Sequence, residues 1–291
     1  MSIHRYVLHN GRVRDAAEAS LFPGQLGLLS GWGVFSTLRA MDGVLFAWER
    51  HWARMSRDAR LLNVEMPADA SAVERDLIHL IEANCEPDCT LRLAVVRNGG
   101  GTWEGPASGR ASDTIALTAP LKRWGESVRL GVQPHARYAA GDFTAAKMLS
   151  WAGNLRWAER AQEQGLDEVI LLNEFGRVAE CTSANVFAVF GGRVFTPPLS
   201  EGCLPGITRE VLLEEIHEKN VEVIERTLSM EELQSADDVF ITSTTRDLLR
   251  VREIDGRAVP GGTGVRERLA GAFHACLLAD VARRRQAPAA V

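Results

Sequence analysis

Short strand hairpins and amphipathic helices occur in both halves of the chain, and this mixture constrains the fold more than any other feature of the sequence. Four tight turns between apolar segments have the composition of β-hairpins. They are Asn10-Gly11, Asp42-Gly43, Gly191-Gly192 and Asp255-Gly256. Apolar residues recur at helical spacing over residues 48–62, 71–84 and from 265 onward. Such a mixture predicts an α+β architecture rather than a doubly wound parallel sheet.

A segment without periodicity separates the two halves. Residues 119–127 contain a proline and a glycine and fit neither a helix nor a strand, which is typical of a linker. The strand before it is predicted over 114–118, and 291 residues are enough for two domains of ordinary size. We therefore predict an N-terminal α/β domain at 1–118, an interdomain linker at 119–127 and a C-terminal, cofactor-binding domain at 128–291.

Composition narrows the class of function. The hydrophobic share of 46% and the charged share of 24% indicate a globular protein, and a net charge of -5 gives no basic balance for nucleic acid or an anionic membrane. No apolar run approaches the length of a membrane span. Five scattered cysteines and no signal peptide favour a reducing, cytoplasmic setting. Because Cys85 and Cys89 lack a second pair of ligands at zinc spacing, we expect no metal.

Two ionisable residues have the surroundings that a covalently bound cofactor needs. Lys147 lies among small and apolar neighbours at 144–149. A desolvated lysine has a depressed pKa and becomes a usable amine nucleophile for a Schiff base. Glu180 follows the apolar strand 168–172 and a turn, so its carboxylate could keep the ring nitrogen of a cofactor protonated. Either residue could instead be a solvated surface side chain.

Several segments could hold the phosphate of such a cofactor. The sequence contains neither a Walker motif nor a G-x-G-x-x-G fingerprint. Gly206 opens a predicted helix, so the amides of Ile207 and Thr208 would be unsatisfied donors at its positive end. Residues 243–245 cluster hydroxyls and amides at a strand end, and Arg54 would supply a positive charge. Each also has an ordinary interpretation as a helix cap, a polar turn or a solvated arginine.

Taken together, these segments resemble the class IV family of pyridoxal-phosphate enzymes. That family holds branched-chain aminotransferases, D-amino-acid aminotransferases and aminodeoxychorismate lyases. Seven matching motifs occur in family order and cover nearly the whole chain. They are Gly33-Val34-Phe35 through Arg39, His51-x-x-Arg54, Lys147, Gly165-x-Asp167-Glu168, Glu180-x-x-Ser183-Ala184-Asn185-Val186-Phe187, Gly206-Ile207-Thr208-Arg209 and Thr242-Ser243-Thr244. The resemblance implies a fold-type IV enzyme with a smaller N-terminal α/β domain, a larger C-terminal domain with a barrel-like sheet, and a homodimer.

The resemblance also implies a role for each candidate residue. Lys147 would form the Schiff base with pyridoxal 5′-phosphate and carry the proton at the substrate Cα, while Glu180 would pair with the pyridine nitrogen. The phosphate would be held by Arg54, the amides of Ile207 and Thr208, and Thr244. Residues placed near the substrate are Trp32, Arg39, Arg97, Ser183, Ala184, Ser243 and Thr245. Trp32 could line the substrate pocket or belong to the core.

The sequence constrains the identity of the substrate less than it constrains the type of reaction. Ala152 stands where branched-chain aminotransferases carry a tyrosine, and Thr102 where D-amino-acid aminotransferases carry a second arginine. Because transamination is the commonest activity of the family, we expect exchange of an amino group between an apolar, branched-chain-type L-amino acid and 2-oxoglutarate. The alternatives are a 4-amino-4-deoxychorismate lyase that releases pyruvate and 4-aminobenzoate, a D-amino-acid aminotransferase, and an idle binding protein that kept the fold.

Overall fold

The chain packs into two compact units. A computed structural model describes residues 2–22, 24–100 and 109–286. The first unit contains the described residues of Met1–Lys122, Ala146–Trp151 and Leu277–Val291, and the second contains Arg123–Ala145 and Ala152–Cys276. The short segment that carries Lys147 therefore packs with the first unit. These are units of packing, and the domain limits given above remain a prediction.

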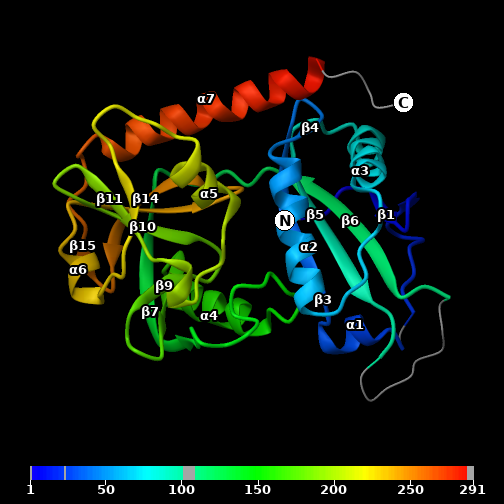
Figure 1. Ribbon diagram of the computed structural model, residues 1–291, viewed down its shortest axis with the longest axis horizontal. Helices are drawn as coiled ribbons and strands as arrows, with labels where there is room; N and C mark the ends of the chain where they lie inside the picture. Colours follow the sequence, from blue (N-terminus) through cyan, green and yellow to red (C-terminus); the bar gives the residue numbers. More distant parts are fainter. Residues whose placement is uncertain (1, 23, 101–108, 287–291) are drawn as a thin grey trace. The chain divides into compact units, whose positions relative to one another are not determined.

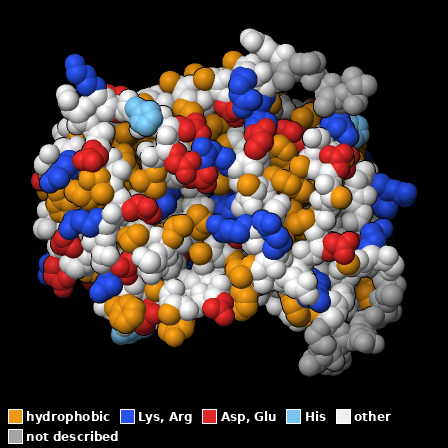
Figure 2. Space-filling model, viewed as in Figure 1, with side chains coloured by type: hydrophobic (Ala, Val, Ile, Leu, Met, Phe, Trp, Pro, Cys, Tyr) orange, Lys and Arg blue, Asp and Glu red, His pale blue; other side chains and the backbone are white. Residues whose placement is uncertain are grey.

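The surface mixes charged and apolar side chains. On the face drawn in Figure 2, acidic and basic side chains are interspersed with hydrophobic ones. Over the described ranges, no helix has both the length and the apolar character needed to cross a membrane. The same part of the chain holds no group of three or more histidine, cysteine or acidic side chains arranged to bind a metal ion.

A six-stranded antiparallel sheet forms the first unit (Figure 1), with the strand order β2-β1-β6-β5-β3-β4. Its strands are β1 (Tyr6–His9), β2 (Arg12–Asp15), β3 (Gly33–Met41), β4 (Val44–Leu45), β5 (Cys89–Arg97) and β6 (Ser112–Pro120). The predicted turns at Asn10-Gly11 and Asp42-Gly43 join β1 to β2 and β3 to β4, with positive φ at all four residues. Strand β6 runs past the predicted 114–118, because its ladder with β5 continues to the pair Cys89 and Pro120.

Two helices cover one face of this sheet. They are α2 (Trp48–Leu61) and α3 (Ala70–Asn84), close to the predicted 48–62 and 71–84, and a short helix α1 (Leu26–Ser30) precedes β3. Met55 and Leu77 from the two helices pack with Leu38 and Leu91 of the sheet in one buried cluster. Because side chains alternate along a strand, Phe35, Thr37 and Arg39 of β3 point to the opposite face.

A curled nine-stranded sheet forms the second unit, as the predicted barrel-like sheet requires. The order is β12-β11-β10-β13-β14-β7-β8-β9, with β15 paired to β14. The strands are β7 (Ser127–Arg137), β8 (Glu168–Asn173), β9 (Val178–Cys181), β10 (Asn185–Phe190), β11 (Arg193–Thr196), β12 (Val223–Glu225), β13 (Asp238–Ser243), β14 (Asp247–Ile254) and β15 (Arg257–Ala258). Pairs β7–β8, β7–β14 and β11–β12 are parallel, whereas the other pairs are antiparallel.

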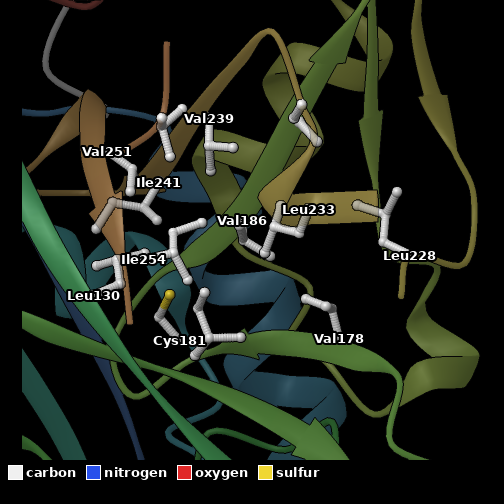
Figure 3. Packing of buried hydrophobic residues seen from close by; sticks show 14 of the residues in the cluster. Leu130, Val178, Cys181, Val186, Leu228, Leu233, Val239, Ile241, Val251 and Ile254 are labelled. Atoms are coloured by element: carbon white, nitrogen blue, oxygen red, sulfur yellow. The ribbon is translucent and has the colours of Figure 1, made fainter. Parts of the chain in front are cut away.

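Aliphatic side chains from several of these strands fill the core of the second unit (Figure 3). Leu130, Val186, Ile241 and Val251, which come from β7, β10, β13 and β14, all have no exposed surface. The remaining helical segments are α4 (Ala152–Glu163), the 3-10 turn η1 (Leu199–Glu201), α5 (Ile207–Glu214), α6 (Met230–Gln234) and α7 (Val265–Gln286). This core fixes the strand ends from which the polar candidate residues project.

Candidate active site

The candidate residues fall into one group in each unit. The first unit contains Trp32, Arg39, Arg54, Arg97 and Lys147. The second contains Glu180, Ser183, Ala184, Ile207, Thr208, Ser243, Thr244 and Thr245. Thr102 lies outside the described residues, and Ala152 begins α4.

The backbone of Lys147 is held on two sides. Its carbonyl oxygen accepts a hydrogen bond from the Phe35 amide at 3.0 Å, and the next residue, Met148, makes an antiparallel bridge to Val34 of β3. The amide of Lys147 donates to the carboxylate of Asp58 at 3.0 Å, and Asp58 on α2 is almost completely buried. A strand edge and a helix thus position the lysine together.

Aromatic rings surround the amine of Lys147. Its Nζ atom lies 4.5 Å from the ring centroid of Phe35 and 5.7 Å from that of Trp151. The two rings pack edge to face, with their centroids 5.9 Å apart. Rings at these distances exclude water from one side of an ammonium group and still attract its charge. The apolar surroundings expected from the sequence therefore come from β3 as well as from the neighbours of Lys147.

Arg54 is connected to a buried histidine through a serine. The Nη2 atom of Arg54 donates to Ser36 Oγ at 2.8 Å, and Ser36 Oγ lies 2.7 Å from Nδ1 of His51. Burial lowers the pKa of His51 well below its usual value, and the charges of Arg54 and Lys147 lower it further. Nδ1 of a neutral His51 can accept a hydrogen bond from the Ser36 hydroxyl. The Ser36 oxygen can then accept the hydrogen bond from Arg54.

The depressed pKa of His51 makes the folded state sensitive to acid. In the unfolded chain a histidine takes up its proton near pH 6.5, whereas folded His51 does so only at lower pH. The free energy of unfolding should therefore fall as the pH drops below about 6.5. Replacing His51 by glutamine should reduce this loss. Urea unfolding of both proteins at about pH 7.5 and about pH 5 measures the difference, and equal losses would contradict this account of His51.

Arg97 and Trp32 are bound to each other and to the backbone. Arg97 donates to the carbonyl oxygens of Gly99 at 2.7 Å and Asn63 at 3.0 Å, and its guanidinium lies 4.2 Å from the ring centroid of Trp32. The Trp32 indole donates to the carbonyl of Leu62 at 2.8 Å and packs against the core of the first unit. Arg39 is half-buried and lies further along β3.

A second arginine of β5, Arg92, was not among the sequence candidates. It pairs with Thr37 in the β3–β5 ladder and so lies on the same face as Phe35. Its guanidinium is 4.1 Å from the ring centroid of Phe35 and 5.9 Å from that of Trp151. Both contacts are made by the guanidinium, and burial lowers its pKa. Strand alternation and the β3–β5 register place Arg92 on this face, and the sequence alone did not indicate it.

In the second unit, Glu180 on β9 is buried and its carboxylate is held by Arg137 and by a backbone amide. Its Oε1 accepts from Nε of Arg137 at 3.0 Å and lies 2.9 Å from Nη2 of the same guanidinium. Its Oε2 accepts from the amide of Leu204 at 3.1 Å. Arg137, at the end of β7, also donates to Asn154 Oδ1 at 3.3 Å. The sequence did not indicate Arg137, which lies 43 residues before its partner.

The start of α5 fits a phosphate group. Gly206 is the N-cap and contributes no side-chain hydrogen bond, so the first amides of the helix, including those of Ile207 and Thr208, are not capped from within it. A Cβ atom at Gly206 would collide with Oδ1 of Asn185. The side-chain amide of Asn185 donates from Nδ2 to the carbonyl of Leu204 at 2.8 Å, which ties this loop to the start of β10.

The two polar turns of the second unit lie at one end of its sheet. Asn185 pairs with Thr242 in the antiparallel β10–β13 ladder, so the turn that precedes β10 and the turn that follows β13 are neighbours. The first turn carries Ser183 and Ala184, and the second carries residues 243–245. Since the loop before α5 contacts both Glu180 and Asn185, the structure brings the whole second group to this end.

Comparison with known proteins places the chain in a family. The model of the family described as amino-transferase class IV matches residues 33–254. A putative branched-chain-amino-acid aminotransferase of Methanocaldococcus jannaschii is 31% identical over 253 residues, 86% of this chain and 88% of that protein. A D-alanine aminotransferase of Bacillus licheniformis is 29% identical over 260 residues, 88% of this chain and 90% of that protein.

A solved structure has the same fold. The crystal structure of a branched-chain aminotransferase from Thermoproteus uzoniensis with norvaline matches with a TM-score of 0.85 and 25% identity, over 95% of this chain and 96% of that one. The predicted fold-type IV architecture and the predicted cofactor are thereby confirmed. A buried carboxylate, an uncapped helix start and a lysine among aromatic rings also fit that cofactor. The chain belongs to the class IV aminotransferases, a family of pyridoxal-5′-phosphate-dependent transferases.

Proposed function

We propose that this enzyme exchanges an amino group between an apolar, branched-chain-type L-amino acid and 2-oxoglutarate. Two relatives named as branched-chain aminotransferases support the apolar substrate. The observation that carries the proposal is Arg92, a desolvated guanidinium beside the rings of Phe35 and Trp151. The rings provide an apolar contact for a branched side chain, and the guanidinium provides a partner for a carboxylate of the acidic co-substrate.

We also propose that both groups of residues serve one cofactor, as the resemblance to the family implies. When bound, pyridoxal phosphate supplies an aldehyde that reacts with amines and a ring that accepts electrons. Lys147 holds the cofactor covalently and moves the proton at the substrate Cα. Glu180 would pair with the ring nitrogen, and Arg137 would orient its carboxylate through the hydrogen bond between them. The phosphate is assigned to Arg54, the amides of Ile207 and Thr208, and Thr244.

The assembly and the location of the enzyme belong to the same proposal. We infer a homodimer from the family resemblance. The five cysteines are all free thiols, which supports a reducing, cytoplasmic setting. Sedimentation of the purified enzyme tests the dimer directly.

A panel of amino donors and acceptors tests the proposed substrates. With L-leucine and 2-oxoglutarate, the holoenzyme should produce L-glutamate and the branched 2-oxo acid. D-Alanine should give no pyruvate above background, and aminodeoxychorismate should give no 4-aminobenzoate. Turnover of D-alanine with no turnover of L-leucine would contradict the proposal in favour of a D-amino-acid aminotransferase. Release of 4-aminobenzoate would favour the lyase.

Replacing Arg92 by glutamine in the same assay should raise the KM for 2-oxoglutarate roughly 10-fold to 100-fold, because a charge-assisted hydrogen bond to a carboxylate is lost. The KM for L-leucine should change less. Arg250→Gln is the matched comparison, since Arg250 donates to the backbone carbonyl of Pro260 at 3.1 Å and has no assigned role at the substrate. It should lower the melting temperature and leave the KM for 2-oxoglutarate nearly unchanged. Equal increases in the KM for 2-oxoglutarate in both variants would show that Arg92 has no specific role in binding this substrate.

A further inference from the structure

A buried ion pair in the second unit has no role in the chemistry assigned above. Glu168, the first residue of β8, has a side chain that is 2% exposed, and the side chain of Arg246 is 7% exposed. Nη2 of Arg246 lies 2.9 Å from Oε2 of Glu168, and its guanidinium is 4.0 Å from the ring centroid of Trp124. Because removing two charges from water is costly, a buried pair is weak evidence for stability alone. Its other contacts indicate what it does.

Both members of the pair hold the polar turns at the sheet end. Glu168 accepts hydrogen bonds from the hydroxyl of Thr182 and, at 2.6 Å, from that of Ser183. Arg246 donates to the carbonyl oxygen of Ser183 at 3.1 Å and to Ser243 Oγ at 3.4 Å. The ion pair therefore joins the turn before β10 to the turn after β13, two segments that are about sixty residues apart in the chain.

We propose that the Glu168–Arg246 pair is a positioning device that sets the separation of these two turns and hence the affinity for the amino acid. The proposal rests on the proposed function and on the family resemblance, which implies that Ser183, Ala184, Ser243 and Thr245 lie near the substrate. Fixing two loops against each other lowers the entropy lost when a ligand bridges them. The pair acts through these turns, so it should affect substrate binding more than the chemical step.

The connection from Arg246 to Glu180 is indirect. The carbonyl oxygen of Thr182 accepts from Asn154 Nδ2 at 2.6 Å, and Asn154 in turn accepts from Arg137, the partner of Glu180. Several hydrogen bonds thus separate Arg246 from the carboxylate assigned to the cofactor ring. A substitution at Arg246 that releases only the turn before β10 should therefore leave cofactor affinity nearly unaltered, because Thr244 lies in the other turn.

Arginine is required at this position because two different acceptors are contacted by one planar group. Nη2 of Arg246 donates a hydrogen bond to Glu168, and Nη1 donates one to the carbonyl of Ser183. A lysine keeps the positive charge, so Glu168 is not left unpaired, but a single ammonium cannot reproduce the fork. Arg246→Lys should therefore preserve the ion pair and release the first turn.

The test compares Arg246→Lys with Arg266→Lys in the holoenzyme. Arg266 is a matched control, because it donates to the carbonyl of Leu248 at 3.3 Å, pairs with Glu267 at 2.5 Å and is 18% exposed. In Arg246→Lys, the KM for L-leucine should rise about fivefold to tenfold, with kcat within about twofold and cofactor affinity unchanged. Amide hydrogen exchange should accelerate in the peptide covering 181–185. Arg266→Lys should change only the melting temperature.

Three outcomes would overturn the inference. A wild-type enzyme that transaminates no amino acid overturns the proposed function as well. An active wild type with an unchanged KM and unchanged exchange in Arg246→Lys overturns the inference alone, as does a parallel loss of cofactor affinity. If Arg246→Lys does not fold, Glu168→Gln serves instead, because it keeps the shape of Glu168 and one acceptor oxygen without its charge. It should raise the KM in the same direction, and an unchanged KM would again overturn the inference.

Discussion

Replacing Lys147 by alanine is expected to lower kcat/KM by at least about 10³-fold and to abolish the visible absorbance of the lysine-bound cofactor. The side chain has two duties in the proposed chemistry, because its amine holds the cofactor covalently and also moves the proton at the substrate Cα. Its backbone is fixed by Phe35 and Asp58. A neighbouring residue therefore cannot bring another amine to the same place.

The other lysines of the chain provide the control for this experiment. The chain contains only three lysines, Lys122, Lys147 and Lys219. Lys219 is exposed beyond the end of α5, so Lys219→Ala should keep both the absorbance and the activity. Absorbance spectra and initial rates of the two variants make the comparison. A coloured, active Lys147→Ala enzyme would refute the assignment.

Replacing Glu180 by glutamine is expected to retain the cofactor and to lower kcat roughly 10²-fold to 10³-fold. The negative carboxylate favours a protonated ring nitrogen, and a protonated ring is the better acceptor of electrons from the substrate Cα. Glutamine keeps the size of the side chain and can still accept from the Leu204 amide. The variant therefore separates the charge of Glu180 from its place in the structure.

Glu159→Gln is the matched control for Glu180→Gln. Glu159 lies on α4 in the same unit, is 65% exposed and pairs only at the surface with Arg156 among the described contacts. Loss of the Glu159 charge in this variant should change kcat by less than about twofold. Cofactor affinity and single-turnover rates measured for both variants distinguish the two effects. An unchanged rate of Cα proton removal in Glu180→Gln would show that the ring nitrogen needs no carboxylate here.

Local sequence signals predicted the elements well, because turns and helices depend on neighbouring residues. Asn10-Gly11 and Asp42-Gly43 adopt the positive φ angles that favour glycine and asparagine or aspartate at hairpin turns. The helices at 48–62 and 71–84 match α2 and α3. The end of β6 was missed, since a ladder with β5 carries that strand into the aperiodic segment. Pairing between distant strands is not encoded in either strand alone.

Three arginines that the sequence did not indicate contribute to the site through distant partners. Arg137 lies 43 residues from Glu180, and Arg246 lies 78 residues from Glu168. Arg92 could be assigned to the site only from the β3–β5 register, which places it beside Phe35. Motifs identify groups that act on a cofactor, but an arginine has the same appearance in sequence whether it is solvated or buried. Its partners follow from the tertiary fold.

The location of the covalent cofactor bond tests the central claim most directly. Borohydride reduction of the holoenzyme, followed by peptide mapping, makes the bond between cofactor and lysine permanent and identifies the lysine. With three lysines in the chain, each falls in a separate peptide region. We predict that the cofactor label is found on Lys147. A label on Lys122 or Lys219, or no label on any lysine of a cofactor-loaded active enzyme, would contradict the account.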